Sequence, residues 1–191
     1  MNRNDMDGYI EEGLEARRSL DLDLIYRIGS DIGSAFNSGS KIILFGNGGS
    51  AADAQHIAAE FVGHFEKERR AVPAMALTVN TSSLTAISND YSYDQVFSRQ
   101  IEAFAKPGDI IIGISTSGNS RNVIEGLRTA RNLGCRTVGL TGSSGGRMAE
   151  FSDYLIRVKS NRTSIIQECH ITVGHLWSKI AEDMLSENNV K

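Results

Sequence analysis

The chain has 191 residues, enough for one domain with a sizeable buried core. It carries 20 Lys and Arg residues against 23 Asp and Glu residues, a balance that argues against a nucleic-acid partner held by phosphate neutralisation. Its apolar runs fall far short of the ~20 residues that span a bilayer, and the residues after Met1 lack the apolar centre of a signal peptide. We therefore expect a cytoplasmic protein with no membrane partner, in which Cys135 and Cys169 stay reduced.

Residues 5–37 carry apolar side chains at helical spacing, which predicts one or two amphipathic helices. We expect a helical arm over 1–37 and an α/β core over 41–186, together forming a single domain over 1–191. A helix outside a sheet must cover its apolar stripe, and self-association is a natural way to do so. The arm therefore predicts a homo-oligomer.

Strand-like and helix-like segments alternate from Lys41 onward. Apolar, often β-branched runs predict strands over 42–45, 74–79, 110–114, 137–140 and 154–158. Segments with helical spacing or good helix formers predict helices over 50–64, 82–88, 94–104, 121–133, 146–151 and 163–186. This alternation predicts an α/β fold with a parallel five-stranded sheet flanked by helices, in which ligands bind at the carboxyl ends of the strands.

The loop after the third predicted strand, residues 115–120, reads Ser-Thr-Ser-Gly-Asn-Ser. A helix is expected to begin there, and its first turn would offer unpaired backbone N–H groups and the positive end of the helix dipole. Hydroxyl groups in the loop can donate to phosphate oxygens without adding bulk. We interpret this loop as a phosphate cradle, although a Ser-capped helix after a flexible turn has a similar sequence.

The loop after the first predicted strand, residues 46–50, reads Gly-Asn-Gly-Gly-Ser. Its glycines let a ligand approach the backbone closely. Gly46, Gly48 and Ala51 also match the dinucleotide-binding pattern G-x-G-x-x-[GA], but the acidic residue that this pattern expects about 20 positions further on is missing. We therefore prefer a second phosphate-handling loop over a nicotinamide or flavin site.

Two other segments favour ordinary structure over function. The loop at 141–146 follows the fourth predicted strand and would join the same edge of the sheet, but a plain turn is the preferred interpretation. The charged run at 66–70 holds the local cluster of basic residues, and we expect a solvated loop there.

The helix predicted at 50–64 places Asp53, His56 and Glu60 on one stripe. His56 and Glu60 could share a metal ion or a proton-transfer task. Such a pair usually marks a solvated helix face, but here a glycine loop lies within a few turns and the neighbouring side chains are small and apolar. The pair is therefore predicted to face a site.

The last predicted helix carries a second polar cluster, Gln167, Glu168 and His170, followed by His175. Glu168 and His175 lie on one stripe, whereas Gln167 and His175 are about 80° apart around the helix and about 12 Å apart along it. Helix geometry alone therefore selects Glu168 as the partner of His175. We leave His170 and His64 without a role, since solvent exposure or a satisfied hydrogen bond accounts for them.

Together these motifs resemble the phosphoheptose isomerases, which have the sugar-isomerase (SIS) phosphosugar-binding fold, a flavodoxin-like sandwich. The resemblance rests on 46–50, 53–60, 114–120 and 167–175, in the family's order, and covers nearly the whole chain. It implies an aldose–ketose isomerase that converts sedoheptulose 7-phosphate to D-glycero-D-manno-heptose 7-phosphate, the first step towards activated heptose for surface polysaccharide. It also implies one Zn²⁺ per subunit and a homotetramer with sites at subunit interfaces.

The resemblance also implies roles for single residues. The zinc ligands would be His56, Glu60, Gln167 and His175, with Glu60 as general base and His175 as general acid. The residues that contact the phosphosugar would be Asn47, Gly48, Gly49, Ser50, Glu60, Asn89, Asp90, Ser115, Thr116, Ser117, Ser120 and Gln167. The family thus selects Gln167 where helix geometry selects Glu168. It often has Asp or Thr a few residues before this Gln, a pattern from which residues 161–166 of this chain depart.

The implied chemistry suits these residue types. Moving a carbonyl group from C2 to C1 removes one proton and returns another through an enediol, which Glu60 and His175 can serve near neutral pH. Zinc would polarise the carbonyl group. Because a carboxylate bound tightly to zinc is a poorer base, we expect Glu60 to bind the metal loosely or to be freed by substrate. The axial gap between Gln167 and His175 suggests a site completed across a subunit interface.

A protein of another class is the alternative. Relatives with this fold bind phosphosugars without catalysis, and one that resembles this chain assists the bacterial replication initiator. Such relatives typically lack the set of His, Glu, Gln and His that this chain has at 56, 60, 167 and 175. The four residues favour the enzyme.

Overall fold

The computed structural model describes residues 2–186. The helices in this range are α1 Arg3–Arg18, α2 Leu22–Asn37, α3 Gly49–Val62, α4 Thr81–Asp90, α5 Val96–Phe104, α6 Arg121–Asn132 and α7 Thr163–Ser186, with 3₁₀ helices η1 Tyr93–Gln95 and η2 Arg147–Phe151. The strands are β1 Ile42–Gly46, β2 Ala74–Ala76, β3 Ile110–Ser115, β4 Arg136–Thr141 and β5 Tyr154–Arg157.

The five strands form one parallel sheet in the order β2-β1-β3-β4-β5, which confirms the predicted fold class. The chain adds β2 on one side of β1 and all later strands on the other side. Loops that leave the carboxyl ends of β1 and β3 therefore diverge, and this divergence opens the crevice in which doubly wound folds bind ligands. Both predicted phosphate loops flank this crevice.

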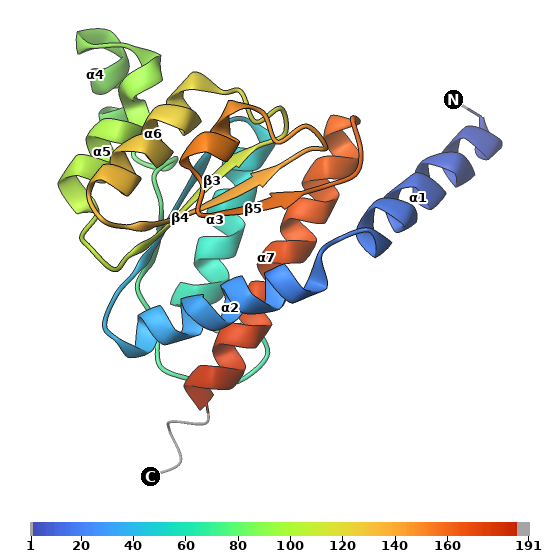
Figure 1. The fold of residues 1–191 in the computed structure, drawn as a ribbon, viewed down its shortest axis with the longest axis horizontal. Helices are drawn as coiled ribbons and strands as arrows, with labels where there is room; N and C mark the ends of the chain where they lie inside the picture. Colours follow the sequence, from blue (N-terminus) through green and yellow to red (C-terminus); the bar gives the residue numbers. More distant parts are fainter. Residues whose placement is uncertain (1, 187–191) are drawn as a thin grey trace.

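Helices cover both faces of the sheet (Figure 1). Ile42 and Leu44 pack with α2, α3 and α7, whereas Ile43 and Phe45, pointing the other way from the same strand, pack with α5 and α6. Because both faces are covered, the central strands are buried along their length and are continuously apolar.

The N-terminal segment forms two helices with different surroundings. The apolar stripe of α2 packs on α7 so closely that a Cβ atom on Gly29 would lie 3.0 Å from Ile180, and one on Gly33 would lie 2.7 Å from Met184 Sδ. Helix α1 instead extends away from the sheet (Figure 1), and most of its residues are exposed. Of the predicted arm, only α1 therefore stands apart.

Some predicted boundaries differ from the observed ones. The strand predicted over 74–79 ends at Ala76, because the chain turns after Leu77 and Asn80 caps α4 by accepting from the Ser83 N–H at 3.0 Å. The helix predicted over 146–151 is the short 3₁₀ helix η2. No helix within 2–186 combines the length and the apolar character needed to cross a bilayer.

Candidate active site and metal centre

The glycine loop brings the start of α3 against the end of β3. Gly48, the N-cap of α3, has a φ of +56°, which favours glycine. A Cβ atom on Gly46 would lie 2.9 Å from the Ile114 carbonyl oxygen. A Cβ atom on Gly49 would lie only 2.5 Å from Gln167 Nε2 of α7. The missing side chains thus let β3 and Gln167 approach the loop backbone.

The loop at 115–120 gathers hydroxyl groups at the start of α6. Ser115 Oγ lies 3.0 Å from Ser120 Oγ and 3.4 Å from Ser117 Oγ. Ser120 is the N-cap residue of α6 but its side chain makes no capping hydrogen bond within the described range. Hydroxyl groups and first-turn N–H groups therefore converge, as an anion site at a helix start requires.

A pair of amide side chains joins the glycine loop to the start of α6. Asn47 Nδ2 donates to Asn122 Oδ1 and Asn122 Nδ2 donates to Asn47 Oδ1, both at 2.9 Å. The Tyr93 hydroxyl also donates to Asn47 Oδ1 at 3.0 Å. Sequence reasoning missed Asn122 and Tyr93, because no spacing pattern links them to the loop. Their contacts fix the amide of Asn47 at the crevice.

Other predicted substrate residues lie in different settings. Ser50 is buried at the start of α3. Asn89 and Asp90 lie at the exposed end of α4, where Asn89 Nδ2 donates to Asp90 Oδ1 at 2.9 Å. Apart from this bond to each other, neither Asn89 nor Asp90 forms a hydrogen bond with a predicted site residue within 2–186. The fold of one chain thus gathers the loop residues but leaves Asn89 and Asp90 outside that cluster.

The loop at 141–146 is more than the plain turn that we predicted. Gly142 and Ser143 line a cavity of about 320 Å³ together with Thr116 and Ser117 of the hydroxyl-rich loop. Ser143 Oγ donates to Asn161 Oδ1 at 2.6 Å across this cavity. The segment that departs from the family pattern, 161–166, therefore lies beside the predicted phosphate loop.

The predicted metal ligands of α3 meet one from α7. His56 Nε2 lies 3.0 Å from Glu60 Oε1 and 3.2 Å from His175 Nε2, and ligand atoms of the three residues all lie within 4.8 Å of one another. The His56 side chain is 50% exposed and that of Glu60 is 23% exposed. The group is therefore open to a ligand, and it forms within one chain.

This group fits a tetrahedral metal ion. Nitrogen and oxygen ligands at 2.0–2.2 Å from a tetrahedral zinc ion lie about 3.3–3.6 Å from each other, a little more than the 3.0 Å and 3.2 Å separations around His56. Two imidazoles and one carboxylate also form a donor set that catalytic zinc sites use, with a position left for water or substrate.

A close helix crossing brings the two imidazoles together. Helices α3 and α7 meet at Gly174, where an added Cβ atom would lie 2.4 Å from Ile57 Cγ1. His56 precedes Ile57 and His175 follows Gly174, so each imidazole is adjacent to the contact. Gln167 lies further towards the start of α7, against Gly49.

The selection of Glu168 from helix geometry is wrong. Glu168 faces α1, where its Oε1 accepts from the Tyr9 hydroxyl at 2.5 Å and its Oε2 accepts from Arg17 Nη2 at 3.1 Å. The carboxylate of Glu168 is therefore bound by side chains of α1 and anchors this helix to α7.

The charged run at 66–70 is only partly solvated, because Arg69 is buried. Arg69 donates to the Glu60 carbonyl oxygen at 2.7 Å, and its Nε lies 3.4 Å from Glu182 Oε1. Both side chains are nearly inaccessible, at 0% and 1% exposed. A buried charge must be paired, and here the pairing ties the end of α3 to α7.

The same carboxylate holds the loop that covers His175. The carboxylate of Glu182 accepts from the backbone N–H groups of Phe65, Glu66 and Lys67 at 2.9, 2.8 and 2.9 Å. The Phe65 ring then stacks on the His175 ring at 5.5 Å between centroids. The buried ion pair thereby supports one wall of the candidate site.

Burial shifts the pKa of two groups near the site. Burial raises the pKa of Asp53 to about 6 against the opposing effect of His56, and Asp53 Oδ2 has no hydrogen-bond partner among the described residues. Burial lowers the pKa of His170 to about 4, so its imidazole is neutral at pH 7, with Nε2 3.3 Å from the Thr141 carbonyl oxygen. His64 is exposed.

Burial also raises the pKa of the free thiol of Cys135 to about 11, which keeps it protonated.

Comparison with known proteins agrees with this geometry. The family model described as SIS domain matches residues 9–142. A probable phosphoheptose isomerase of Thermoplasma volcanium is 64% identical over 178 residues, covering 93% of this chain and 91% of the relative. The chain is also similar to solved phosphoheptose isomerases. That of Neisseria gonorrhoeae has a TM-score of 0.86 at 38% identity, covering 93% of this chain and 97% of the other. That of Francisella tularensis has a TM-score of 0.90 at 32% identity, covering 96% and 100%. The chain belongs to the phosphoheptose isomerases of the SIS domain family.

Proposed function

We propose that this aldose–ketose isomerase converts sedoheptulose 7-phosphate to D-glycero-D-manno-heptose 7-phosphate at the crevice between β1 and β3. The observation that carries the proposal is the group of His56, Glu60 and His175 in one chain, on α3, which begins at the glycine loop, and on α7, which also carries Gln167. A group that can polarise a carbonyl and move a proton, in a fold that also presents a phosphate cradle, is what isomerisation of a phosphosugar requires.

The metal in this proposal is one Zn²⁺ per subunit. His56, Glu60 and His175 would hold it, and the family implies the amide oxygen of Gln167 as a further ligand. Because Gln167 and His175 of one chain lie about 12 Å apart along α7, the Gln167 that completes the site would come from a neighbouring subunit. Bound zinc would polarise the substrate carbonyl and stabilise negative charge on the enediolate. The ligand separations and the donor types described above support this assignment.

The loops would bind the two ends of the sugar phosphate. Ser115, Thr116, Ser117 and Ser120 would donate to the phosphate. The glycine loop with Asn47 and Ser50, together with Asn89 and Asp90, would contact the sugar hydroxyl groups. Support comes from the converging hydroxyl groups at the start of α6 and from the fixed amide of Asn47.

Glu60 would carry the proton between C2 and C1 of the sugar, and His175 would protonate the enediolate. The contact between His56 Nε2 and Glu60 Oε1 keeps this carboxylate beside the imidazoles. Since a carboxylate bound tightly to a cation is a weak base, Glu60 would leave the metal or bind it loosely when substrate arrives.

Proton NMR of sedoheptulose 7-phosphate in D₂O with zinc-loaded protein tests the reaction. We expect a new aldose anomeric signal together with deuterium at the carbon that is reprotonated. Phosphosugar binding without any aldose would contradict the proposal and favour the regulatory alternative.

Replacement of Glu60 tests the proton carrier. We expect Glu60→Gln to lower kcat by at least about 100-fold, a typical effect of losing a general base, with the phosphosugar still bound. Glu66→Gln removes a carboxylate from the neighbouring loop and serves as the control. Full turnover by the Glu60→Gln protein with zinc bound would remove Glu60 from this role.

We also propose a cytoplasmic homotetramer with sites near subunit interfaces. Helix α1 supports self-association, because Met6, Ile10 and Leu14 form one apolar stripe and are 54%, 56% and 37% exposed. Ile10→Asp is expected to reduce the assembly in light scattering, whereas Glu11→Gln on the same helix is not. An unchanged mass for the Ile10→Asp protein would contradict this role for α1.

A further inference from the structure

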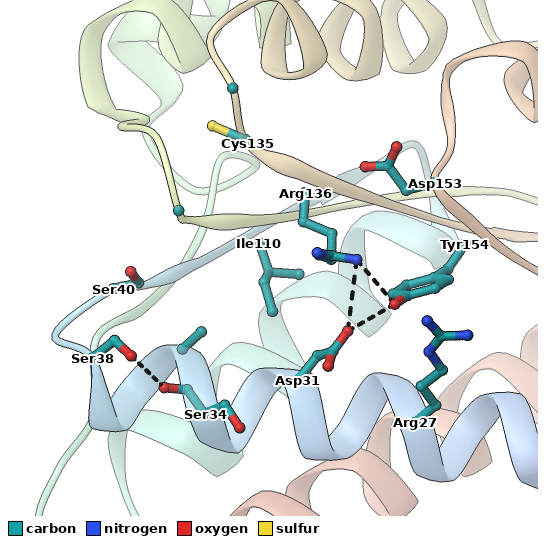
Figure 2. Close-up of a pocket in the computed structure, with 13 residues that line it drawn as sticks. Arg27, Asp31, Ser34, Ser38, Ser40, Ile110, Cys135, Arg136, Asp153 and Tyr154 are labelled. Atoms are coloured by element: carbon teal, nitrogen blue, oxygen red, sulfur yellow. Dashed lines mark hydrogen bonds and ion pairs between the residues drawn. The ribbon is translucent and has the colours of Figure 1, made fainter.

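A second polar cavity lies at the amino ends of the strands, the opposite end of the sheet from the candidate active site. Figure 2 shows the residues that line it. It has a volume of about 580 Å³ and opens between α2 and the amino ends of β3, β4 and β5. This volume is within the range of about 300–1,000 Å³ that is typical of small-molecule sites. Nothing in the proposed reaction uses this cavity.

Two guanidinium groups lie beside one aromatic ring in this cavity. The guanidinium carbons of Arg27 and Arg136 lie 5.2 Å and 5.3 Å from the centre of the Tyr154 ring. Arg136 Nη1 donates to the Tyr154 hydroxyl at 2.9 Å. Arg27 has no hydrogen bond or ion pair in the part of the chain that the structure describes, so its donors are available to a ligand.

A carboxylate and hydroxyl groups face the same space. Asp31 Oδ2 accepts from the Tyr154 hydroxyl at 2.9 Å and lies 3.9 Å from Arg136 Nη1 (Figure 2). The hydroxyl groups of Ser34 and Ser40 line the cavity and have no hydrogen bond to any other described residue. The cavity's other carboxylate, Asp153, already accepts from the Thr137 N–H and hydroxyl.

We propose that this cavity binds a phosphate ester that carries free hydroxyl groups, as a site separate from the candidate active site. Guanidinium groups suit phosphate because they offer paired N–H donors. Asp31 would repel a bare anion but can accept hydrogen bonds from sugar or ribose hydroxyl groups. The hydroxyl groups of Ser34 and Ser40 can form hydrogen bonds with the phosphate or with the hydroxyl groups of the ligand. The ligand must therefore carry both kinds of group, as a sugar phosphate or a nucleoside diphosphate does.

Binding here has a structural route to α7. One wall of the cavity is α2, whose opposite side crosses α7 at Gly29 and Gly33 with almost no free space. A ligand that draws α2 towards the sheet edge would therefore act on the helix that carries Gln167 and His175. The site itself does not depend on the proposed reaction.

Calorimetric titration of the full chain tests the site with two probes. Sorbitol 6-phosphate is a sugar phosphate that lacks a carbonyl group and cannot be isomerised, and ADP is a nucleoside diphosphate. The double variant Arg27→Gln/Arg136→Gln removes both guanidinium groups. Its matched control, Arg18→Gln/Lys159→Gln, removes two charges at exposed residues outside the cavity that make no hydrogen bond or ion pair within 2–186.

We expect at least one probe to bind at a site that the double variant weakens at least tenfold and the control leaves within twofold. Sorbitol 6-phosphate would then lose one of two sites per chain, whereas ADP would lose its single site, which distinguishes the two sources. Ser34→Leu, which fills the cavity and keeps every charge, should weaken the same site. If the double variant bound each probe with the same affinity and the same number of sites as the wild-type protein, the proposal would be overturned. Equally tight binding of inorganic phosphate would overturn the requirement for hydroxyl groups.

Discussion

Helix α7 carries polar side chains that have opposite surroundings. His175 is partly exposed and meets His56 and Glu60 without being enclosed. Glu182 and His170, on the same helix, are 1% and 0% exposed and are bonded to the protein's own backbone. On this helix, the exposed side chain is left free for a ligand, whereas the buried polar side chains maintain the shape of the site.

The sharpest test of this comparison removes the open side chain. We expect His175→Ala to lower kcat/KM by about 10³-fold or more, equivalent to about 4 kcal/mol, because the proposed metal ligand and the proposed proton donor are lost together. The free energy of unfolding of the metal-free protein should change by less than about 1 kcal/mol, since the side chain is partly exposed. Activity assays and urea denaturation measure the two effects. Lys179→Ala, at an exposed residue of α7, is the control, and a large loss of stability on replacing His175 would break the comparison.

The reverse pattern is expected at the buried ion pair. Glu182→Gln should lower the free energy of unfolding by about 3–5 kcal/mol, because the Arg69 guanidinium would stay buried without its counter-ion. The apolar double replacement Arg69→Met/Glu182→Leu should recover part of the loss. Glu66→Gln, on the exposed side of the same loop, should cost less than about 0.5 kcal/mol. Urea denaturation of the four proteins would contradict this account if Glu182→Gln matched Glu66→Gln.

His170 should make stability depend on pH. Its pKa of about 4 in the folded protein is below the ordinary 6.5, so between these values the unfolded chain binds more protons. Stability contributed by the neutral imidazole is present above pH 6.5 and is lost as the pH falls towards 4, by about 3 kcal/mol in total.

The pKa of Asp53 is raised from 3.8 to about 6 in the folded protein, so between these values the folded protein binds more protons and its stability rises as the pH falls, opposite to the effect of His170. We therefore compare wild-type protein with His170→Gln at pH 4.5 and pH 7, because Asp53 is common to both. Wild-type protein should lose more stability on acidification than the variant. Parallel losses in urea denaturation would show that His170 does not titrate in this way.

The smallest effect is expected where α7 meets α1. Glu168→Gln weakens two bonds to Tyr9 and Arg17 at a partly exposed position, so the cost should be at most about 1 kcal/mol. Hydrogen exchange should rise over α1, while turnover stays within twofold of wild type. Glu15→Gln, on the exposed side of α1, is the matched control. A large loss of turnover would return Glu168 to the candidate site.

Local sequence patterns predicted most of the fold. The β-branched runs at 110–114 and 137–140 are central strands, and helical spacing over 163–186 gave the bounds of α7, because these signals depend on neighbours along the chain. The strand at 74–79 was predicted too long, since Asn80 ends it by capping the next helix.

The site depends on contacts across long stretches of sequence. His56 and Glu60 share a stripe by local spacing, but no period connects His56 to His175, and the grouping of the two came from the family resemblance. Glu168 was misread because its partners belong to α1, and Arg69 was misread because its partner Glu182 belongs to the far end of α7. Charge runs and helix faces can be interpreted only once the opposing element is known.

The contact between Gly174 and Ile57 has a consequence for which ions the protein can accept. Two helices that touch at backbone distance hold the two imidazole nitrogens 3.2 Å apart. A pair of imidazoles suits Zn²⁺ and similar transition-metal ions rather than Ca²⁺, which takes oxygen ligands. A side chain at position 174 would wedge the helices apart and enlarge the opening. The glycine at position 174 thus helps to determine which metal ions the protein can hold.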